Sequence, residues 1–344
     1  MSASREPRPP DVPVSPEVSV PPDVLVIGCG VIGLTSALEL QAAGARVAIA
    51  ARDLPPDTVS NVAAAFWYPY AVEPLSRCLP WALESLAVFR EHARDPGSGV
   101  VLRRAVELVP EGLEAPGWLV GLPGARPARA DELRAGFPSG VVFEAPAVET
   151  SIYLPWLMER FRSRGGTIGV ERFDALDDAL ARAPIVVDCA GLGARELARD
   201  PSVVPIRGQI LRVELGALES VLVAHDARGG ATYVIPRSSD CVLGGTRVEG
   251  REDLAVDPAE SADVLARAAR LDPAAARARV LGAVVGLRPG RPSVRLELER
   301  RPTGRIVHNY GHGGGGVTLS WGAAREACRL ALGGEAVKKR VTPA

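Results

Sequence analysis

A glycine-rich turn, GCGVIG at 28–33, follows an apolar run of strand length at 24–28. Apolar residues then recur with helical spacing over 34–44, and a second apolar run covers 46–51. These patterns predict a strand, a helix and a second strand, which together imply a parallel sheet. Glycines spaced G-x-G-x-x-G at the first turn of such a unit are typical of dinucleotide binding.

Each glycine of this turn has a physical role in that interpretation. Gly28 permits the tight turn, Gly30 lets a pyrophosphate approach the backbone, and Gly33 lets the helix pack on the strand. The first helical residues, Val31 and Ile32, offer free N–H groups and the positive end of the helix dipole to the phosphates.

Arg52 and Asp53 follow the second predicted strand and do not identify which dinucleotide is bound. The acid that usually binds ribose is missing from the end of that strand. Asp53 can reach the ribose instead, whereas Arg52 can hold a 2′-phosphate, which would indicate NADP. This stretch alone does not distinguish a ribose contact by Asp53 from a 2′-phosphate contact by Arg52.

A second glycine run, GHGGGG at 311–316, follows a strand predicted from residue 305 and precedes a helix predicted over 317–334. It forms a second helix N-terminus that can face phosphates or a ring. Two such loops in one chain suit a long dinucleotide such as FAD, with adenine at the first loop and isoalloxazine at the second.

The middle of the chain predicts a second domain with a mixed sheet. We expect the fold class α/β, with a Rossmann-like FAD-binding domain and an inserted mixed-sheet substrate and interface domain. The predicted elements are helices over 153–166, 194–200 and 258–271, and strands over 185–191, 207–215, 232–237 and 241–250.

Length and charge exclude several classes of protein. The chain has 344 residues, which predicts about two domains, and a net charge of −1, which gives no overall field for nucleic acid or an anionic membrane. It lacks the run of about 18 apolar residues that spans a bilayer. Residues 1–22 contain seven prolines and no secretory core, which predicts a disordered tail and a cytoplasmic protein. The five cysteines lack zinc spacing, so we expect free thiols and no metal.

The basic residues are strongly biased toward arginine. There are 38 arginines and two lysines, and only two each of asparagine, glutamine and methionine. Few thermolabile side chains and many arginines suit a heat-stable protein. Codon bias in a GC-rich genome is the open alternative.

Seven motifs, in this order, resemble the D-amino-acid oxidase family, which includes D-aspartate oxidase. The resemblance covers the chain from Val24 to about Leu332. The motifs are VIGCGVIGL (26–34), ARDLPPDTVSNVAAAFWYPY (51–70), DCAGLGA (188–194), RGQI (207–210), HDARGGATYVIP (225–236), GLRPGRP (286–292) and HNYGHGGGGVTLSWG (308–322).

The resemblance implies a discontinuous FAD-binding domain and a role for each matched residue. The FAD-binding domain would comprise 23–75, 150–203 and 284–335, and the substrate domain 76–149 and 204–283. Arg288 would bind the substrate carboxylate, Tyr233 would add a hydroxyl to it, and the Gly314 carbonyl would take the amine. Phe66, Tyr68, Tyr70 and His225 would line the substrate pocket. The other FAD contacts would be Arg52, Ser60, Ala64, Ala65 and Phe173, together with Gly313, Gly314, Gly315, Gly316, Val317 and Thr318 of the second loop.

The chemistry of these residue types fits the implied roles. Arginine offers a planar, two-pronged donor that stays charged at every working pH. Hydride transfer to flavin needs positioning rather than an acid or base side chain. Other interpretations stay open: Arg288 as an interdomain ion pair, Tyr233 as sheet packing, and His225 as the cap of a turn before Asp226. His308 and His312 are expected to orient the flavin loop rather than to titrate.

The resemblance leaves the substrate side chain open. D-aspartate oxidases share GGTR at 244–247, so Arg247 is a candidate pocket residue for an acidic side chain, but they usually have an arginine where this chain has His225. We expect neutral D-amino acids, with D-aspartate oxidase as the alternative. The loop 227–232 has no lid tyrosine, and the C-terminus lacks a peroxisomal Ser-Lys-Leu ending.

The expected partners are a D-amino acid and dioxygen, with no nucleic acid and no membrane, and a homodimer is left open. The rival functions are an NAD(P)-linked dehydrogenase and a flavin-binding sensor without turnover.

Overall fold

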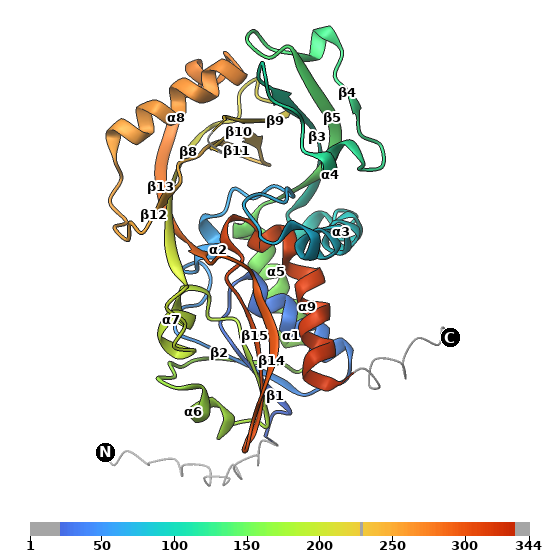
Figure 1. Ribbon diagram of the computed structural model, residues 1–344, viewed down its shortest axis with the longest axis vertical. Helices are drawn as coiled ribbons and strands as arrows, with labels where there is room; N and C mark the ends of the chain where they lie inside the picture. The colour runs from blue at the N-terminus through green and yellow to red at the C-terminus, as the bar shows by residue number, and fades with distance from the viewer. Residues whose placement is uncertain (1–20, 228–229, 334–344) are drawn as a thin grey trace, which may run out of the picture.

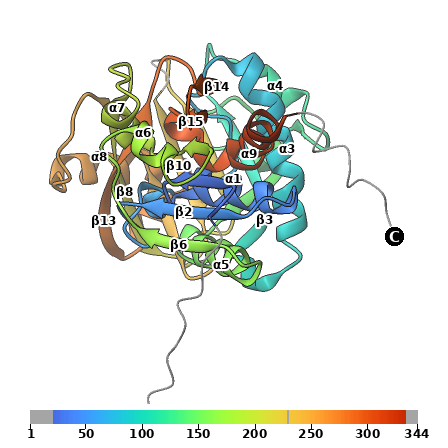
Figure 2. The same cartoon turned by 90° about the horizontal axis from the view of Figure 1, so that it is seen from below.

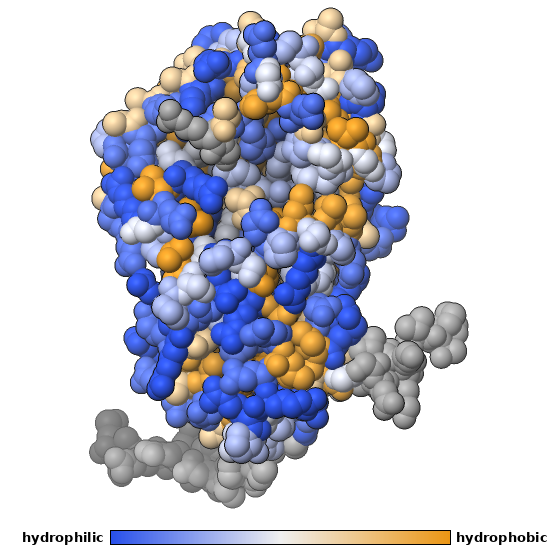
Figure 3. Space-filling model, in the orientation of Figure 1, coloured by the Kyte–Doolittle hydropathy of each residue, from blue (hydrophilic) through white to orange (hydrophobic). Residues whose placement is uncertain are grey.

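The computed structural model describes residues 21–227 and 230–333, which form two sheets stacked along the long axis of the molecule (Figure 1). The predictions for the tail before residue 21, for part of the loop 227–232 and for the C-terminal ending lie outside these residues. In the described residues, no helix is long and apolar enough to cross a bilayer. Hydrophilic residues predominate on the face in Figure 3, and apolar ones form small separate groups.

The lower sheet in Figure 1 has six strands in the order β14-β15-β7-β1-β2-β6. Its strands run parallel except β14, which is antiparallel to β15. This confirms the parallel sheet that the first strand–helix–strand unit implies. The strands are β1 (Val24–Ile27), β2 (Val47–Ala51), β6 (Thr167–Val170), β7 (Ile185–Asp188), β14 (Arg295–Arg301) and β15 (Gly304–Tyr310).

Helices cover both faces of this sheet (Figures 1 and 2). Val24 and Val26 belong to the core beneath α1 and α9, whereas Leu25 and Ile27 belong to the core beneath α6 and α7. A strand buried on both faces is apolar throughout, which is why 24–28 reads as an unbroken apolar run. The helices of this layer are α1 (Val31–Ala42), α3 (Leu75–His92), α5 (Thr150–Ser163), α6 (Leu176–Leu180), α7 (Ala194–Leu197) and α9 (Gly316–Leu332).

The upper sheet has nine strands. Eight of them follow the order β12-β8-β11-β10-β9-β3-β5-β4, and the ninth, β13, also pairs with β8. β3 and β9 run parallel and the remaining pairs antiparallel, so the sheet is mixed, as predicted. The strands are β3 (Val100–Val109), β4 (Arg126–Pro127), β5 (Ser139–Val148), β8 (Val204–Glu214), β9 (Val221–His225), β10 (Ala231–Pro236), β11 (Asp240–Gly244), β12 (Val248–Glu249) and β13 (Val280–Gly290).

Helix α8 (Pro258–Leu271) covers the outer face of this sheet and coincides with the predicted helix over 258–271. Its first N–H groups are capped by the Asp257 carboxylate. Val264, Ala268 and Leu271 pack with Val106 of β3 and neighbouring apolar residues. Because strand side chains alternate between faces, Glu107 faces inward, toward the six-stranded sheet.

Four long elements had no sequence prediction: α3, β3, β5 and β13. α3 packs against α9. The division into two discontinuous domains stays a prediction, and β13 crosses the boundary proposed at residue 284. Two short helices, α2 (Val59–Val62) and α4 (Gly117–Val120), complete the fold.

Candidate active site

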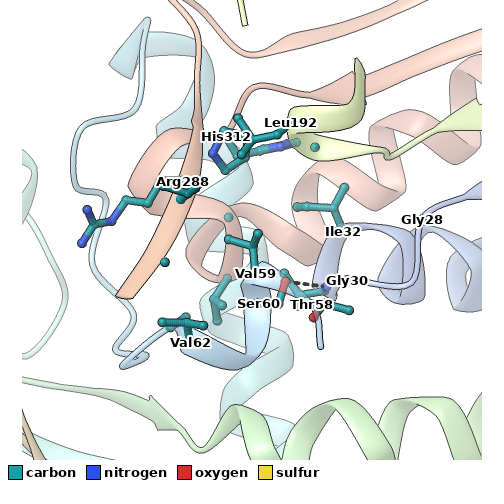
Figure 4. A pocket seen from close by; sticks show the side chains of 18 of the residues that line it. Gly28, Gly30, Ile32, Thr58, Val59, Ser60, Val62, Leu192, Arg288 and His312 are labelled. Atoms are coloured by element: carbon teal, nitrogen blue, oxygen red, sulfur yellow. Dashed lines mark hydrogen bonds between the residues drawn. The ribbon is translucent and has the colours of Figure 1, made fainter. Parts of the chain in front are cut away.

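A cavity of about 870 Å³ lies between the two sheets and is lined by residues of both. The ends of β1, β2 and β7 and helix α2 line it from the lower layer, and β9, β10 and β13 line it from the upper sheet. Figure 4 shows Leu192 and His312 on one side, Ser60 and Val62 on another, and Arg288 extending from β13. All the sequence-predicted site residues line this cavity except Gly33, Gly315 and Arg247.

The first glycine turn is closely packed. Gly28 has φ +106°, a left-handed conformation that favours glycine, and an added Cβ would contact the carbonyl of Cys189. A Cβ on Gly33 would clash with the carbonyl oxygen of Gly28, so Gly33 serves helix packing rather than the cavity surface. The Ser60 hydroxyl accepts a 3.0 Å hydrogen bond from the Val31 N–H at the start of α1 (Figure 4).

The second glycine run forms a short 3₁₀ turn, η5 (Gly313–Gly315), from which α9 begins at Gly316. Gly314 lies against the ring of Tyr70, 3.1 Å from the position of an added Cβ to Cδ1. Gly315 faces the side chain of Val72 instead, which is why it does not line the cavity. The loop therefore exposes its backbone at Gly313, Gly314 and Gly316.

Two buried polar atoms at this end have no partner in the described residues. They are Nε2 of His312 and Oδ1 of Asn309, and both residues line the cavity. Burial lowers the pKa of His312 to about 4, so the ring is neutral at pH 7 and can both donate and accept. Unpaired buried polar groups next to two glycine turns fit a long, polar dinucleotide.

The outer end of the cavity holds the ambiguous pair after β2. Arg52 donates a 2.7 Å hydrogen bond to Asp53, and both side chains are substantially exposed. The Asp53 carboxylate thus engages the guanidinium that an NADP 2′-phosphate would need. Ala64, Ala65 and Phe173 line the same cavity.

Arg288 and Tyr233 meet at the other end. The half-buried Arg288 guanidinium lies over Gly208 and donates a 3.1 Å hydrogen bond to the Thr246 carbonyl. Within residues 21–227 and 230–333, no carboxylate forms an ion pair with it, so the interdomain ion pair finds no support there. Burial raises the pKa of Tyr233, and the neighbouring Arg288 opposes that rise.

An aromatic wall connects this end to the glycine loop. His225 stacks on Tyr68 with ring centroids 5.5 Å apart and lies 5.7 Å from Tyr70. The backbone of Tyr68 exchanges two hydrogen bonds of 3.0–3.1 Å with the Thr318 hydroxyl in the first turn of α9. Phe66 completes the wall. The wall and the glycine loop are thereby held as one unit.

The described partner of His225 lies on β3. The imidazole Nδ1 lies 2.8 Å from Oε1 of Glu107, a β3 residue that the sequence analysis did not single out. The signal for Glu107 was a carboxylate inside the apolar stretch AVELV (105–109).

Arg247 lies apart from the other predicted pocket residues. Its side chain is exposed on the segment between β11 and β12 and does not line the cavity. The one acidic-substrate feature that the sequence contains therefore lies outside the cavity wall.

The segment 189–193 lines the cavity but was absent from the predicted site. The sequence does contain a signal that places this segment at the site. DCAGLGA follows a buried strand, and the carboxyl ends of parallel strands meet at one edge of the sheet. From α2 only Ser60 was predicted, and Val59 and Val62 line the cavity beside it.

This chain is similar to known proteins over most of its length. A family model described as FAD dependent oxidoreductase matches residues 23–330. The chain is 49% identical over 311 residues to a D-amino-acid oxidase of Rubrobacter xylanophilus, covering 89% of this chain and 95% of that protein. It is 47% identical over 314 residues to a D-amino-acid oxidase of Streptomyces coelicolor, covering 90% and 96%.

A solved structure of glycine oxidase from Geobacillus kaustophilus has the same fold. The TM-score is 0.77 at 22% identity, covering 90% of this chain and 94% of that chain. At this identity the likeness concerns the fold alone.

Proposed function

The chain belongs to the FAD dependent oxidoreductase family, and from that premise we propose that it is a D-amino-acid oxidase. Its substrate is oxidised to an imino acid, which hydrolyses to a 2-oxo acid and ammonia. FAD is the cofactor, and dioxygen is reduced to hydrogen peroxide.

The observation that carries this proposal is the arrangement within one cavity. Arg288, Tyr233 and the aromatic wall line the same cavity as the two glycine turns, and the second turn packs against β13, the strand that carries Arg288. A half-buried guanidinium that forms no ion pair in the described residues suits a carboxylate, which every amino acid carries.

We assign the binding of the substrate to three groups. Arg288 takes the α-carboxylate through two parallel N–H donors, and Tyr233 donates its hydroxyl to the same carboxylate. The Gly314 carbonyl accepts an N–H of the amine. With two substituents of the α-carbon fixed, the α-hydrogen has one direction, so a single enantiomer presents it to the acceptor.

The FAD-binding residues are those of the two glycine turns together with Arg52, Asp53, Ser60, Ala64, Ala65 and Phe173. Held by these residues, FAD would supply an acceptor for the α-hydrogen and its electron pair, with dioxygen as the final acceptor. Neutral His312 and Asn309 offer their unpaired polar atoms to the cofactor at the second turn. The protein's part is to orient the substrate and exclude water.

Anaerobic reduction tests the activity. Holoenzyme mixed with D-alanine is expected to lose its flavin absorbance, and to form hydrogen peroxide once air is admitted. L-alanine is the matched control. A colourless protein that binds NADPH would contradict the proposal in favour of a dehydrogenase, and a yellow protein unmoved by any D-amino acid would favour a sensor.

Neutral D-amino acids are the proposed substrates, and the exposed position of Arg247 supports this choice over D-aspartate. A panel of D-Val, D-Ala, D-Pro and D-Asp with a peroxide readout tests it. D-Asp as the best substrate would make the protein a D-aspartate oxidase.

Assembly, location and heat stability remain parts of the proposal. We propose a cytoplasmic protein, with a homodimer as the assembly to test. Its arginine bias and scarcity of thermolabile residues predict an unfolding midpoint of the holoenzyme above about 65 °C. A midpoint of roughly 45–65 °C would leave codon bias as the explanation.

A further inference from the structure

Glu107 is a buried carboxylate that the binding of the α-carbon does not use. It is 2% exposed and lies near the carboxyl end of β3. Strand register pairs Glu107 with Val223 of β9, and Val223 with Tyr233 of β10. Residues opposite each other on neighbouring strands share a face, so Glu107 lies in the same row as Tyr233.

The contacts of Glu107 place its charge directly behind the cavity wall. Oε1 lies 2.8 Å from Nδ1 of His225, which lines the cavity. Oε2 has no hydrogen-bond partner in the described residues. Burial and the nearby Glu107 carboxylate raise the pKa of Tyr68, which also lines the cavity.

His225 lies between two spaces. A small pocket of about 60 Å³ lies on the Glu107 side and is lined by both residues. The large cavity lies on the other side. The imidazole, bonded to Glu107 through Nδ1, is therefore what separates the carboxylate from a bound molecule.

We propose that Glu107 and His225 form a charge-selective subsite for the substrate side chain, an inference that rests on the proposed oxidase function. The subsite disfavours acidic D-amino acids and admits neutral and cationic ones. The physical reason is that a carboxylate in a weakly polarisable interior acts over several ångströms with little screening. Arg288, which binds the α-carboxylate, supplies a positive charge common to all substrates and does not distinguish side chains.

Pairs of substrates that differ in charge but hardly in shape isolate this effect. D-aspartate and D-asparagine form one pair, and D-lysine and D-norleucine form a second. We expect the holoenzyme to show a higher kcat/KM for D-asparagine than for D-aspartate. The variant Glu107→Gln keeps the shape and a hydrogen bond to His225 while removing the charge. It should raise the D-Asp to D-Asn ratio of kcat/KM about tenfold and lower the D-Lys to D-norleucine ratio.

Glu144→Gln is the matched control, because Glu144 is an exposed carboxylate on the neighbouring strand β5. It should leave both ratios unchanged. Glu107→Met removes the charge without a buried amide, and serves if the glutamine variant loses flavin.

The outcomes separate the subsite from the activity. Failure of the wild-type holoenzyme to oxidise D-alanine would contradict the oxidase proposal itself. Normal oxidation of D-alanine, with a wild-type D-Asp to D-Asn ratio near one, would overturn the subsite without any variant. The same conclusion follows if Glu107→Gln and Glu107→Met both turn over D-alanine but keep the wild-type ratios.

Discussion

The cofactor end of the cavity is formed by backbone at two glycine turns, whereas the substrate end is formed by side chains from separate strands. At Gly28 and Gly33 the packing leaves no room for a Cβ. At Arg288, Tyr233 and His225 the working groups are a guanidinium, a phenol and an imidazole. Added side-chain atoms should therefore damage the cofactor end, whereas removal of side-chain groups should damage the substrate end.

The largest expected effect is at the substrate end. Arg288→Met removes the partner of a carboxylate, a change that costs on the order of 2–5 kcal/mol, or roughly 30- to several-thousand-fold in kcat/KM. All D-amino acids should suffer alike, and Arg288→Lys should rescue poorly because a point charge cannot reproduce the two-pronged donor. Steady-state kinetics on D-alanine and D-valine measure the loss.

Flavin content is the control for that variant, since the comparison predicts that the cofactor end is untouched. Near wild-type turnover of D-alanine by Arg288→Met would refute the assignment of the carboxylate site.

An added methyl group should damage the cofactor end. Gly33→Ala forces a Cβ against the Gly28 carbonyl, and overpacking of this kind lowers the free energy of unfolding by about 1–3 kcal/mol. We expect weaker flavin retention and a lower thermal midpoint. Gly169→Ala on β6 is the matched control, because an added Cβ there meets nothing within 4 Å. Equal behaviour of the two variants would show that the turn is not closely packed.

Asp200, between α7 and β8, makes the stability of the fold depend on pH. Burial alone would raise the pKa of Asp200, but hydrogen bonds from Ser202, Arg291 and Tyr310 outweigh it and hold that pKa at about 2. A carboxyl with a depressed pKa stabilises the fold above its unfolded value of 3.8 and loses that contribution as pH falls toward 2. The contribution at neutral pH is about 2 kcal/mol.

Asp200→Asn should therefore lower stability at pH 7, and the difference from wild type should shrink below about pH 4. Thermal unfolding of both proteins at pH 7, 5 and 3 checks this. A difference that stays constant across the three pH values would assign the effect to shape rather than charge.

The smallest effect is expected at Arg247. Because its side chain is exposed outside the cavity, Arg247→Ala should change kcat/KM by less than about twofold for both D-alanine and D-aspartate. A selective defect on D-aspartate would show that the segment between β11 and β12 closes over the substrate.

The features that were predicted correctly from the sequence depend on residues that are close together in the chain. The turn at 28–33, the helix that α1 forms and the loop before α9 all depend on local spacing and on glycine chemistry. The region between 75 and 148 was missed because α3, β3 and β5 carry mixed patterns whose partners lie far away. The substrate residues were named through a resemblance, and spacing alone would not have joined Arg288 to Tyr233.

The dinucleotide-binding fold follows from local sequence, because each glycine turn is a contiguous segment whose conformation depends on its own residues. The tertiary structure decided which side chains face the substrate. Register between β3, β9 and β10 brings Glu107 into the row of Tyr233, and the course of the chain after β11 leaves Arg247 outside. A shift of one residue in register would turn every side chain of a strand to the opposite face, and no local pattern specifies that alignment.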